Sequence, residues 1–202
     1  MITSFDQLDL NKTYSYADYL TWQFSERVEL FRGRVFRMSP APNRRHQEIS
    51  FELSVYIGVF LKGKHCKAFT APFDVRLPLP ENKQKSGKVD TVVQPDIVVV
   101  CDPSKLDEQG CNGAPDFIIE ILSPGNSRRE MKTKFELYET AGVKEYWLVE
   151  PLRECVTCYH LDATGQYVGS RPYFADDDIP SWVLDGFVLK GRDILNEWED
   201  LN

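Results

Sequence analysis

Two carboxylates stand in stretches of this sequence where hydrocarbon is expected. Asp96 follows Pro95 at the start of the β-branched run Ile97–Cys101, and Glu120 lies in the middle of the apolar run Asp116–Leu122. Both runs have the length of buried strands. Because a buried carboxylate without a partner costs free energy, Glu120 requires a cation, a metal ion or a proton.

The geometry of strands decides which carboxylate can join Glu120. Asp116 shares a strand face with Glu120, but four residues at about 3.3 Å each separate the two by roughly 13 Å, too far to share a metal ion. Asp96 belongs to a neighbouring strand about 5 Å away, and a suitable register would bring it to Glu120. We therefore predict that Asp96 and Glu120 form one site. Carboxylate oxygens are the ligands that Mg²⁺ prefers.

A helix that follows the second strand offers this pair a cation. The sequence predicts the helix over Arg128–Ala141, because Ser-Pro and Gly residues end the strand before it and a glycine follows it. Glu130, Lys134 and Tyr138 are spaced by four and share one helix face. If that face covers the strand ends, Lys134 reaches the carboxylates. A closing strand is expected at 143–149.

The other predicted elements must hold these residues in place. They are a short helix at 15–24, a β-hairpin at 27–38, a helix at 46–61, a strand at 73–77, a second hairpin at 154–160 and 165–170, and a last helix at 194–201. Glu29 lies in the first strand of the first hairpin. His46 opens the helix at 46–61, where it either faces a site near the sheet or is solvated. The residues expected on the buried side of that helix are Ile49, Leu53, Tyr56, Ile57 and Phe60.

Length and composition predict a single globular domain. The 202 residues, 42% of them hydrophobic, divide into an N-terminal helix and hairpin (1–42), a core (43–150) and an acidic C-terminal extension (151–202). We expect a soluble, cytoplasmic protein without a membrane partner, since no apolar run approaches 18 residues and the N-terminus lacks a signal pattern.

The five cysteines predict a reducing compartment without a disulfide framework, because their number is odd and three of them are scattered singly. Cys155 and Cys158 form one C-x-x-C, but no second pair stands at the spacing of a zinc ribbon. Positions three apart on a strand also face opposite ways. We therefore expect these two cysteines to be structural.

Charge is distributed unevenly along the chain. Residues 1–134 hold 19 basic and 17 acidic side chains, whereas residues 135–202 hold 5 and 14. The segment 27–67 is basic, with nine against three, and is either a nucleic-acid contact or an ordinary solvated face. Candidate nucleic-acid contacts are Arg44, Arg45, Arg128 and Arg129.

The order of these motifs resembles the Uma-two family, which is abundant in cyanobacteria and belongs to the PD-(D/E)xK nuclease superfamily. The hairpin, the SPAPxxxH helix start, QPD, IEILSP and AGVKEYWLVEP carry the resemblance, which covers about residues 15–195. It implies an α/β (mixed α+β) fold with a restriction-endonuclease-like αβββαβ core and a mixed central sheet. The N-terminal helix and hairpin and a C-terminal β-hairpin would be additions to that core.

The resemblance also implies roles for individual residues. The Pro-Asp motif falls on Asp96 and the glutamate of the (D/E)xK motif on Glu120, so both are expected to bind metal together with the backbone carbonyl of Ile121. The superfamily lysine falls on Leu122, a departure, and its role passes to Lys134 on the following helix.

The sequence therefore predicts an endonuclease that uses Mg²⁺, or Mn²⁺ in its place, to hydrolyse nucleic acid, DNA in preference to RNA. Asp96, Glu120 and Lys134 are the expected catalytic residues. Accessory positions are His46, Glu29 and Glu130. A homodimer is expected, because cutting both strands of a duplex requires two sites.

Three other interpretations stay open at this point. The carboxylates and the lysine can form a structural ion pair without catalysis. The chain can be a catalytically inactive nuclease-fold module that binds nucleic acid or protein, which the net charge of −7 and Leu122 favour. A metal-dependent hydrolase of another phosphate ester would use the same chemistry.

Overall fold

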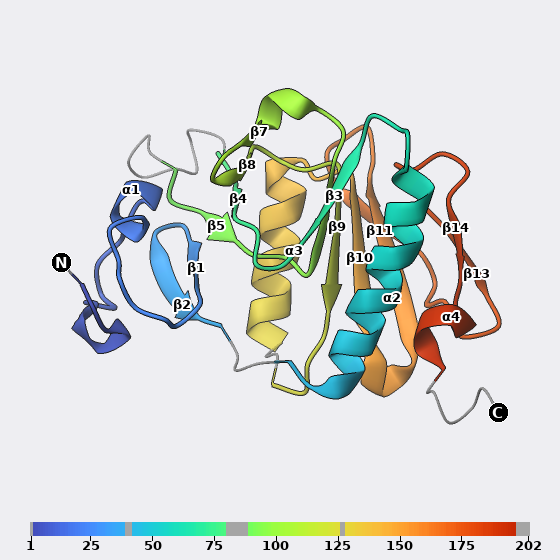
Figure 1. The fold of residues 1–202 in the computed structure, drawn as a ribbon, viewed down its shortest axis with the longest axis horizontal. Coiled ribbons are helices and arrows are strands. Elements are labelled where there is room, and N and C mark those ends of the chain that lie inside the picture. The colour runs from blue at the N-terminus through green and yellow to red at the C-terminus, as the bar shows by residue number, and fades with distance from the viewer. Residues whose placement is uncertain (1, 39–41, 80–88, 126–127, 197–202) are drawn as a thin grey trace.

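A six-stranded mixed sheet forms the centre of the computed structural model, which describes residues 2–38, 42–79, 89–125 and 128–196. Helix α2 (Arg44–Leu61) covers one face of this sheet and helix α3 (Arg128–Ala141) the other (Figure 1). In spatial order the strands are β12 (Tyr167–Gly169), β11 (Cys155–Leu161), β10 (Glu145–Glu150), β9 (Phe117–Ile121), β6 (Ile97–Val100) and β3 (Lys67–Thr70).

The predicted αβββαβ core is confirmed, because α2, β3, β6, β9, α3 and β10 follow one another in this order along the chain. β9 runs parallel to β10 and antiparallel to β6. The parallel pair is possible because α3 provides the crossover between its two strands. The C-terminal hairpin β11–β12 extends the same sheet beyond β10.

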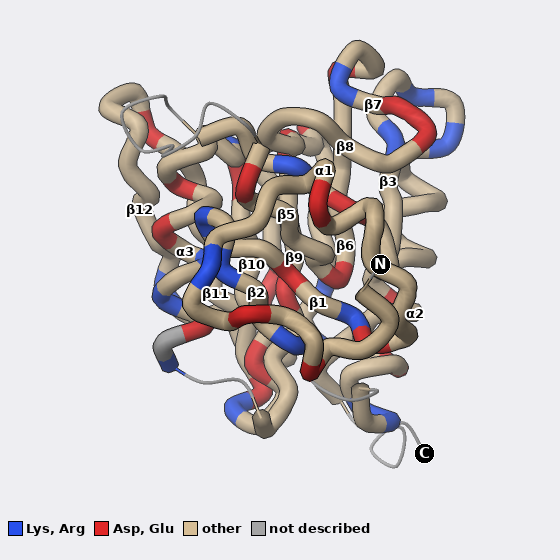
Figure 2. The backbone as a smooth tube through the Cα atoms, turned by 90° about the vertical axis from the view of Figure 1, so that its left-hand side faces the viewer, with Lys and Arg blue, Asp and Glu red and all other residues tan. Residues whose placement is uncertain are grey.

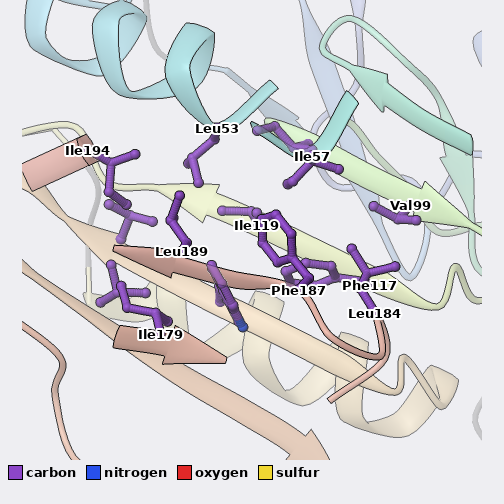
Figure 3. Close-up of a cluster of buried hydrophobic side chains, with 14 of the residues drawn as sticks. Leu53, Ile57, Val99, Phe117, Ile119, Ile179, Leu184, Phe187, Leu189 and Ile194 are labelled. Carbon is purple, nitrogen blue, oxygen red and sulfur yellow. The ribbon is translucent and has the colours of Figure 1, made fainter. Parts of the chain in front are cut away.

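Side chains of β9 alternate between the two faces of the central sheet. Phe117, Ile119 and Ile121 belong to the apolar cluster under α2, and Ile118 belongs to the cluster under α3. Figure 3 shows the first cluster, in which residues of α2 meet the C-terminal segment, including Phe187. Glu120 thus points toward α3, as the alternation predicts.

A second six-stranded sheet, which the sequence analysis did not predict, joins the N-terminal hairpin to the core. Its strands, in spatial order, are β2 (Arg34–Arg37), β1 (Val28–Phe31), β5 (Val92–Val93), β4 (Val75–Arg76), β8 (Gly110–Asn112) and β7 (Leu106–Asp107). The predicted hairpin is confirmed as β1–β2, which turns at Arg32 and Gly33, both with positive φ. β7 and β8 lie between β6 and β9, where the sequence analysis predicts no strand.

Some predicted helix boundaries and faces are wrong. Helix α1 (Tyr16–Tyr19) is shorter than expected, although Ser15 forms the expected cap. On α2, Tyr56 is 38% exposed, and Leu61 is buried instead, because the inner face follows a spacing of four from Ile49. Helix α4 (Arg192–Leu195) begins before the predicted last helix, part of which lies outside the described residues.

One pair of cysteines contradicts the expectation of no disulfide. Cys66 and Cys101 form a disulfide although 35 positions separate them in the sequence. β3 and β6 pair antiparallel with Lys67 opposite Val100, so the residues just beyond this pair face each other. Cys155 and Cys158 are free and buried in β11, in agreement with a structural role. No helix in the described part of the chain has the length and apolarity needed to span a membrane.

The C-terminal segment is attached to the central sheet through a buried carboxylate. Glu145 begins β10 and is fully buried. Its Oε1 accepts a hydrogen bond from Trp147 Nε1 at 2.7 Å, and its Oε2 accepts from Ser181 Oγ at 2.6 Å. The backbone amides of Trp182 and Val183 donate to the same Oε2 at 3.0 and 2.9 Å. This carboxylate therefore fixes the start of the segment that covers the α2 side of the sheet.

We predict that Glu145→Ala lowers the free energy of unfolding by about 2 to 4 kcal/mol, because one buried and three part-buried donors lose their acceptor. Urea denaturation followed by circular dichroism measures the change. Glu136→Ala, at a half-exposed position of α3, is the control and should change stability by about 0.5 kcal/mol or less. Equal stability losses in the two variants would contradict the anchoring role.

Candidate active site

A polar cleft lies where the C-terminal end of β9 meets the N-terminal end of β6, between the first turn of α2 and the side of α3. Its wall combines residues of both sheets and both helices. The lining residues are Arg27, Met38, Pro42, His46, Gln94, Asp96, Glu120, Ile121, Ser123, Glu130 and Lys134.

The register of β6 and β9 brings Asp96 and Glu120 together. Ile97 pairs with Ile119, so one further step of the antiparallel ladder places Asp96 opposite Glu120. Directly opposite residues share a sheet face. Asp96 Oδ2 also accepts a hydrogen bond from the backbone amide of Ile121 at 2.8 Å, which fixes the carboxylate at the strand end.

Helix α3 supplies two partners for the buried carboxylate of Glu120. Lys134 Nζ donates to Glu120 Oε1 at 2.9 Å, and the Tyr138 hydroxyl donates to the same oxygen at 2.6 Å. The two side chains are one helical turn apart and therefore stack on the face of α3 that packs against β9. The predicted contact between Lys134 and Glu120 is thus present.

Glu29 is the second counterion of Lys134. Its Oε1 lies 3.1 Å from Lys134 Nζ and accepts a hydrogen bond from the backbone amide of Gln94 at 2.9 Å. The second sheet positions Glu29, because β1 pairs with β5 through Leu30 and Val92, two residues before Gln94. Lys134 consequently bridges two buried carboxylates that come from different sheets.

Burial and charge together set the protonation of this cluster. Burial raises the pKa of Glu120 to about 7, and the charges of Asp96 and Glu29 also raise it, while Lys134 and Tyr138 oppose the shift. Burial lowers the pKa of Lys134, but the two carboxylates outweigh it and raise that pKa well above its ordinary value. Burial and the same carboxylates raise the pKa of Tyr138. These directions favour the protonated ammonium of Lys134 and the neutral, hydrogen-bond-donating hydroxyl of Tyr138.

His46 faces the cleft, which decides between the two alternatives that the sequence left open. Its ring is buried, with Nε2 3.2 Å from Asp96 Oδ2. Burial lowers the pKa of His46, but the hydrogen bond and charge of Asp96, together with Glu120 and the backbone of Ile121, raise it overall. Its buried Nδ1 has no hydrogen-bond partner among the described residues.

The donors at this end of the sheet fit a hard divalent cation. Asp96 and Glu120 offer carboxylate oxygens, and the main chain of Ile121 contacts both Asp96 and His46. Among the described residues, no group of three or more His, Cys, Asp or Glu ligand atoms within 4.8 Å of one another includes Asp96 or Glu120. A cation held here would therefore complete its shell with a main-chain carbonyl and water.

The four arginines proposed for nucleic-acid contact have different surroundings. Arg44 is exposed and pairs with Glu48 at 3.0 Å, whereas Arg45 donates to the backbone carbonyls of Ile194 and Leu195 and so attaches α2 to α4. Arg128 is exposed at the start of α3, and the side chain of Arg129 is outside the described part of the chain. Figure 2 shows basic and acidic positions interspersed on the side that it presents.

Sequence reasoning missed the roles of two residues in the cleft. Tyr138 was placed on the helix face of Lys134 but was given no role, although its spacing of four from Lys134 could have indicated the contact with Glu120. Gln94 was not considered, yet its side chain accepts from Arg27 at 2.8 Å and donates to Asp74 at 2.8 Å. A polar residue directly before Pro-Asp in an apolar stretch was the available signal.

Comparisons with known proteins bear on the family and the fold of the chain. A family model described as "Uma2: Putative restriction endonuclease" matches residues 16–190. An uncharacterised protein of Synechocystis sp. is 25% identical over 154 residues, covering 75% of this chain and 76% of the relative. The crystal structure of a protein from Anabaena variabilis, described as a putative nuclease belonging to DUF820, superposes with a TM-score of 0.70. That likeness covers 90% of this chain and 97% of the other at 21% identity, and shows that the two share a nuclease-like fold.

We predict that Lys134→Met lowers the free energy of unfolding by about 3 to 5 kcal/mol, because two buried carboxylates lose their common cation. Lys132→Met, at an exposed position of the same helix, is the control and should change stability by about 0.5 kcal/mol or less. Adding Glu29→Gln to Lys134→Met should recover part of the loss, since one buried charge is removed. Additive losses in the double variant would contradict a shared counterion.

Proposed function

Because the chain belongs to the Uma2 family, we propose that it is a divalent-metal-dependent endonuclease that hydrolyses phosphodiester bonds of nucleic acid, DNA in preference to RNA. One observation carries this proposal. Two carboxylates, Asp96 and Glu120, lie opposite each other at the end of the sheet beside a buried, protonated Lys134. This combination of oxygen donors and a fixed cation suits chemistry on a phosphate diester.

Asp96, Glu120 and the backbone carbonyl of Ile121 would hold Mg²⁺, and Mn²⁺ would substitute for it. When bound, the ion supplies positive charge that stabilises phosphate oxygens and lowers the pKa of a water molecule. The carboxylates suit this task because one is fixed by the Ile121 amide and the other by Lys134 and Tyr138. The donor set therefore needs little rearrangement to accept a cation.

Lys134 would stabilise the negative charge that develops on the phosphate. Its pKa is raised by Glu120 and Glu29 despite burial, so it stays protonated and does not serve as a general base. In the overall reaction a water oxygen bonds to phosphorus, the bond from phosphorus to the sugar oxygen breaks, and a proton of the water ends on that oxygen. Lys134 lowers the barrier by electrostatics at the phosphate.

The accessory residues would act through these three. Glu29 holds Lys134 charged and in place from the side of the second sheet. His46 contacts Asp96 and can orient its carboxylate. Glu130 lines the same cleft, one helical turn before Lys134, where it could position water.

A specific observation also supports a second candidate, a nuclease-fold module without catalysis. Lys134 already neutralises two carboxylates, and such a buried cluster can persist for structural reasons alone. In that case Asp96 and Glu120 would bind no metal ion, and nucleic acid or protein would bind without being cleaved. Metal titration separates the two candidates.

We predict that Mn²⁺ binds wild type and that Asp96→Asn and Glu120→Gln each weaken binding at least about tenfold, because a charged ligand is lost. Calorimetric titration measures the affinity, with circular dichroism as the check on folding. Asp102→Asn, in a cap at the opposite end of β6, is the control and should bind as wild type does. The same two site variants should cleave plasmid DNA and a single-stranded RNA at least about 100-fold more slowly.

Two outcomes would overturn the proposal in different ways. Absence of Mn²⁺ binding in folded wild type would favour the noncatalytic module. Metal binding without cleavage of any DNA or RNA would keep the carboxylate site and remove the nuclease.

We predict that Tyr138→Phe lowers kcat about tenfold with little change in KM, because Glu120 loses a hydrogen bond that fixes its position. The acid side of the pH–rate profile should move to higher pH, since this hydrogen bond lowers the pKa of Glu120. Tyr167→Phe is the control, because its buried hydroxyl donates to the backbone carbonyl of Val143 instead. An unchanged pH profile in Tyr138→Phe would show that the hydroxyl is only structural.

A further inference from the structure

A disulfide and a histidine meet at the end of β6 opposite to the cleft with Asp96 and Glu120. Cys66 precedes β3 and Cys101 follows β6, and the antiparallel register of these strands places the two cysteines opposite each other. His65 comes directly before Cys66, and its Nε2 lies 3.4 Å from Cys66 Sγ. One ligand atom from each of these three residues lies within 4.8 Å of the other two. Two sulfurs and an imidazole are thus gathered at one point.

These residue types form a ligand set for a soft divalent cation once the disulfide is reduced. Thiolates and imidazoles are the ligands that Zn²⁺ prefers in tetrahedral sites, whereas a disulfide offers no thiolate. Bond lengths of about 2.3 Å to sulfur and about 2.0 Å to nitrogen put the sulfur and nitrogen ligands of such a site about 3.5 Å apart. The distance of 3.4 Å between His65 Nε2 and Cys66 Sγ fits this spacing. Cys101 supplies the second sulfur from across the strand pair.

A cavity of about 470 Å³ lies beside these residues and gives an ion access from solvent. His65, Cys66 and Cys101 all line it. The side chain of His65 is exposed, that of Cys101 is partly buried, and that of Cys66 is buried. Three protein ligands leave the fourth position of a tetrahedral ion open, and water from the cavity can fill it.

The neighbouring side chains support the three ligands without joining them. Asp116 Oδ2 accepts a hydrogen bond from the backbone amide of Cys101 at 2.8 Å, and its Oδ1 accepts from Lys144 Nζ at 2.7 Å. Asp116 therefore fixes the main chain of a ligand, as groups around metal sites commonly do. His160 also lines the cavity, but its ring stacks on Trp182 with centroids 4.1 Å apart, and it is outside the group of three.

We propose that Cys66, Cys101 and His65 bind Zn²⁺ when a dithiol reductant has opened the disulfide. The reductant gives two electrons and two protons to the S–S bond and itself becomes a disulfide, so that the bond breaks and two thiols form. Zn²⁺ then binds both sulfurs, and their two protons pass to solvent. Asp96 and Cys101 stand about 16 Å apart, five steps of about 3.3 Å along β6, so this site is separate from the proposed nuclease centre.

Titration of Co²⁺ into reduced wild type tests the proposal, because Co²⁺ replaces Zn²⁺ in tetrahedral sites and absorbs characteristically when thiolates bind it. The protein is reduced with a dithiol, which is then removed in the absence of oxygen. We expect a single equivalent of Co²⁺ to give the sulfur-to-cobalt absorption band, and Zn²⁺ to abolish it. The oxidised protein should give no band. A cation at Asp96 and Glu120 would not produce the band, since these residues offer only oxygen.

Variants of the three residues identify the ligands. Cys66→Ser and Cys101→Ser should each abolish the band, and His65→Gln, which keeps both thiols, should weaken Co²⁺ binding at least about tenfold. His160→Gln is the matched control for the histidine, because it lies in the same cavity outside the group of three. Cys155→Ser is the control for the cysteines, because Cys155 is free and belongs to the C-x-x-C. Both controls should bind Co²⁺ as wild type does.

Circular dichroism verifies that each protein is folded, and His65→Gln changes an exposed side chain that the fold does not require. A folded, reduced wild type without the band would overturn the proposal. So would a band that persists in Cys66→Ser, a band that is lost in Cys155→Ser, or an affinity for Co²⁺ that His65→Gln leaves unchanged. None of these measurements depends on nuclease activity.

Discussion

The ion cluster of Lys134 with Glu29 and Glu120 is the constraint on which the rest of the structure depends. Each of these charges is buried, and each would be costly alone, so all three must be in place before any one of them is tolerated. They come from α3, β1 and β9, three elements that are distant in the sequence. The cluster therefore couples the N-terminal hairpin to the central sheet and its crossover helix, and the fold closes around it.

The second sheet matters because it delivers one of these charges. β5 pairs with β1, and the chain then passes through Gln94 into Asp96 and β6. The amide of Gln94 holds Glu29, and its side chain bonds Arg27 and Asp74. The cleft thus forms at the junction of two sheets, where neither sheet alone brings all its residues together. The segment between β5 and β6 thus positions Asp96, and through the amide of Gln94 it also positions Glu29, the second counterion of Lys134.

Local signals in the sequence were enough to predict one half of this arrangement. A carboxylate inside an apolar strand pointed to Glu120, a proline at a strand start to Asp96, and a helical spacing of four to Lys134. The strands of the central sheet were predicted from apolar, β-branched runs. The other half depends on pairings that leave no local trace. Strands of two residues, such as β5 and β7, have no periodicity, and the contact of Glu29 with Lys134 spans more than a hundred positions. The disulfide at Cys66 was missed for the same reason, since only the register of β3 and β6 reveals it.

Lys134 stands on a helix, while the position two residues after Glu120 is Leu122, and this arrangement has a consequence for the charge balance. Leu122 packs at the edge of the apolar cluster under α3, while Lys134 approaches Glu120 from that helix and touches Glu29 on its other side. With two counterions, Lys134 does not depend on Glu120 alone to stay protonated. If the carboxylate of Glu120 bound a cation in the cleft, Glu29 would still hold the ammonium of Lys134 in place. A lysine two residues after Glu120 would be positioned by β9. It would not lie on the face of α3 that reaches both carboxylates. Lys134 in turn neutralises the buried carboxylate of Glu29.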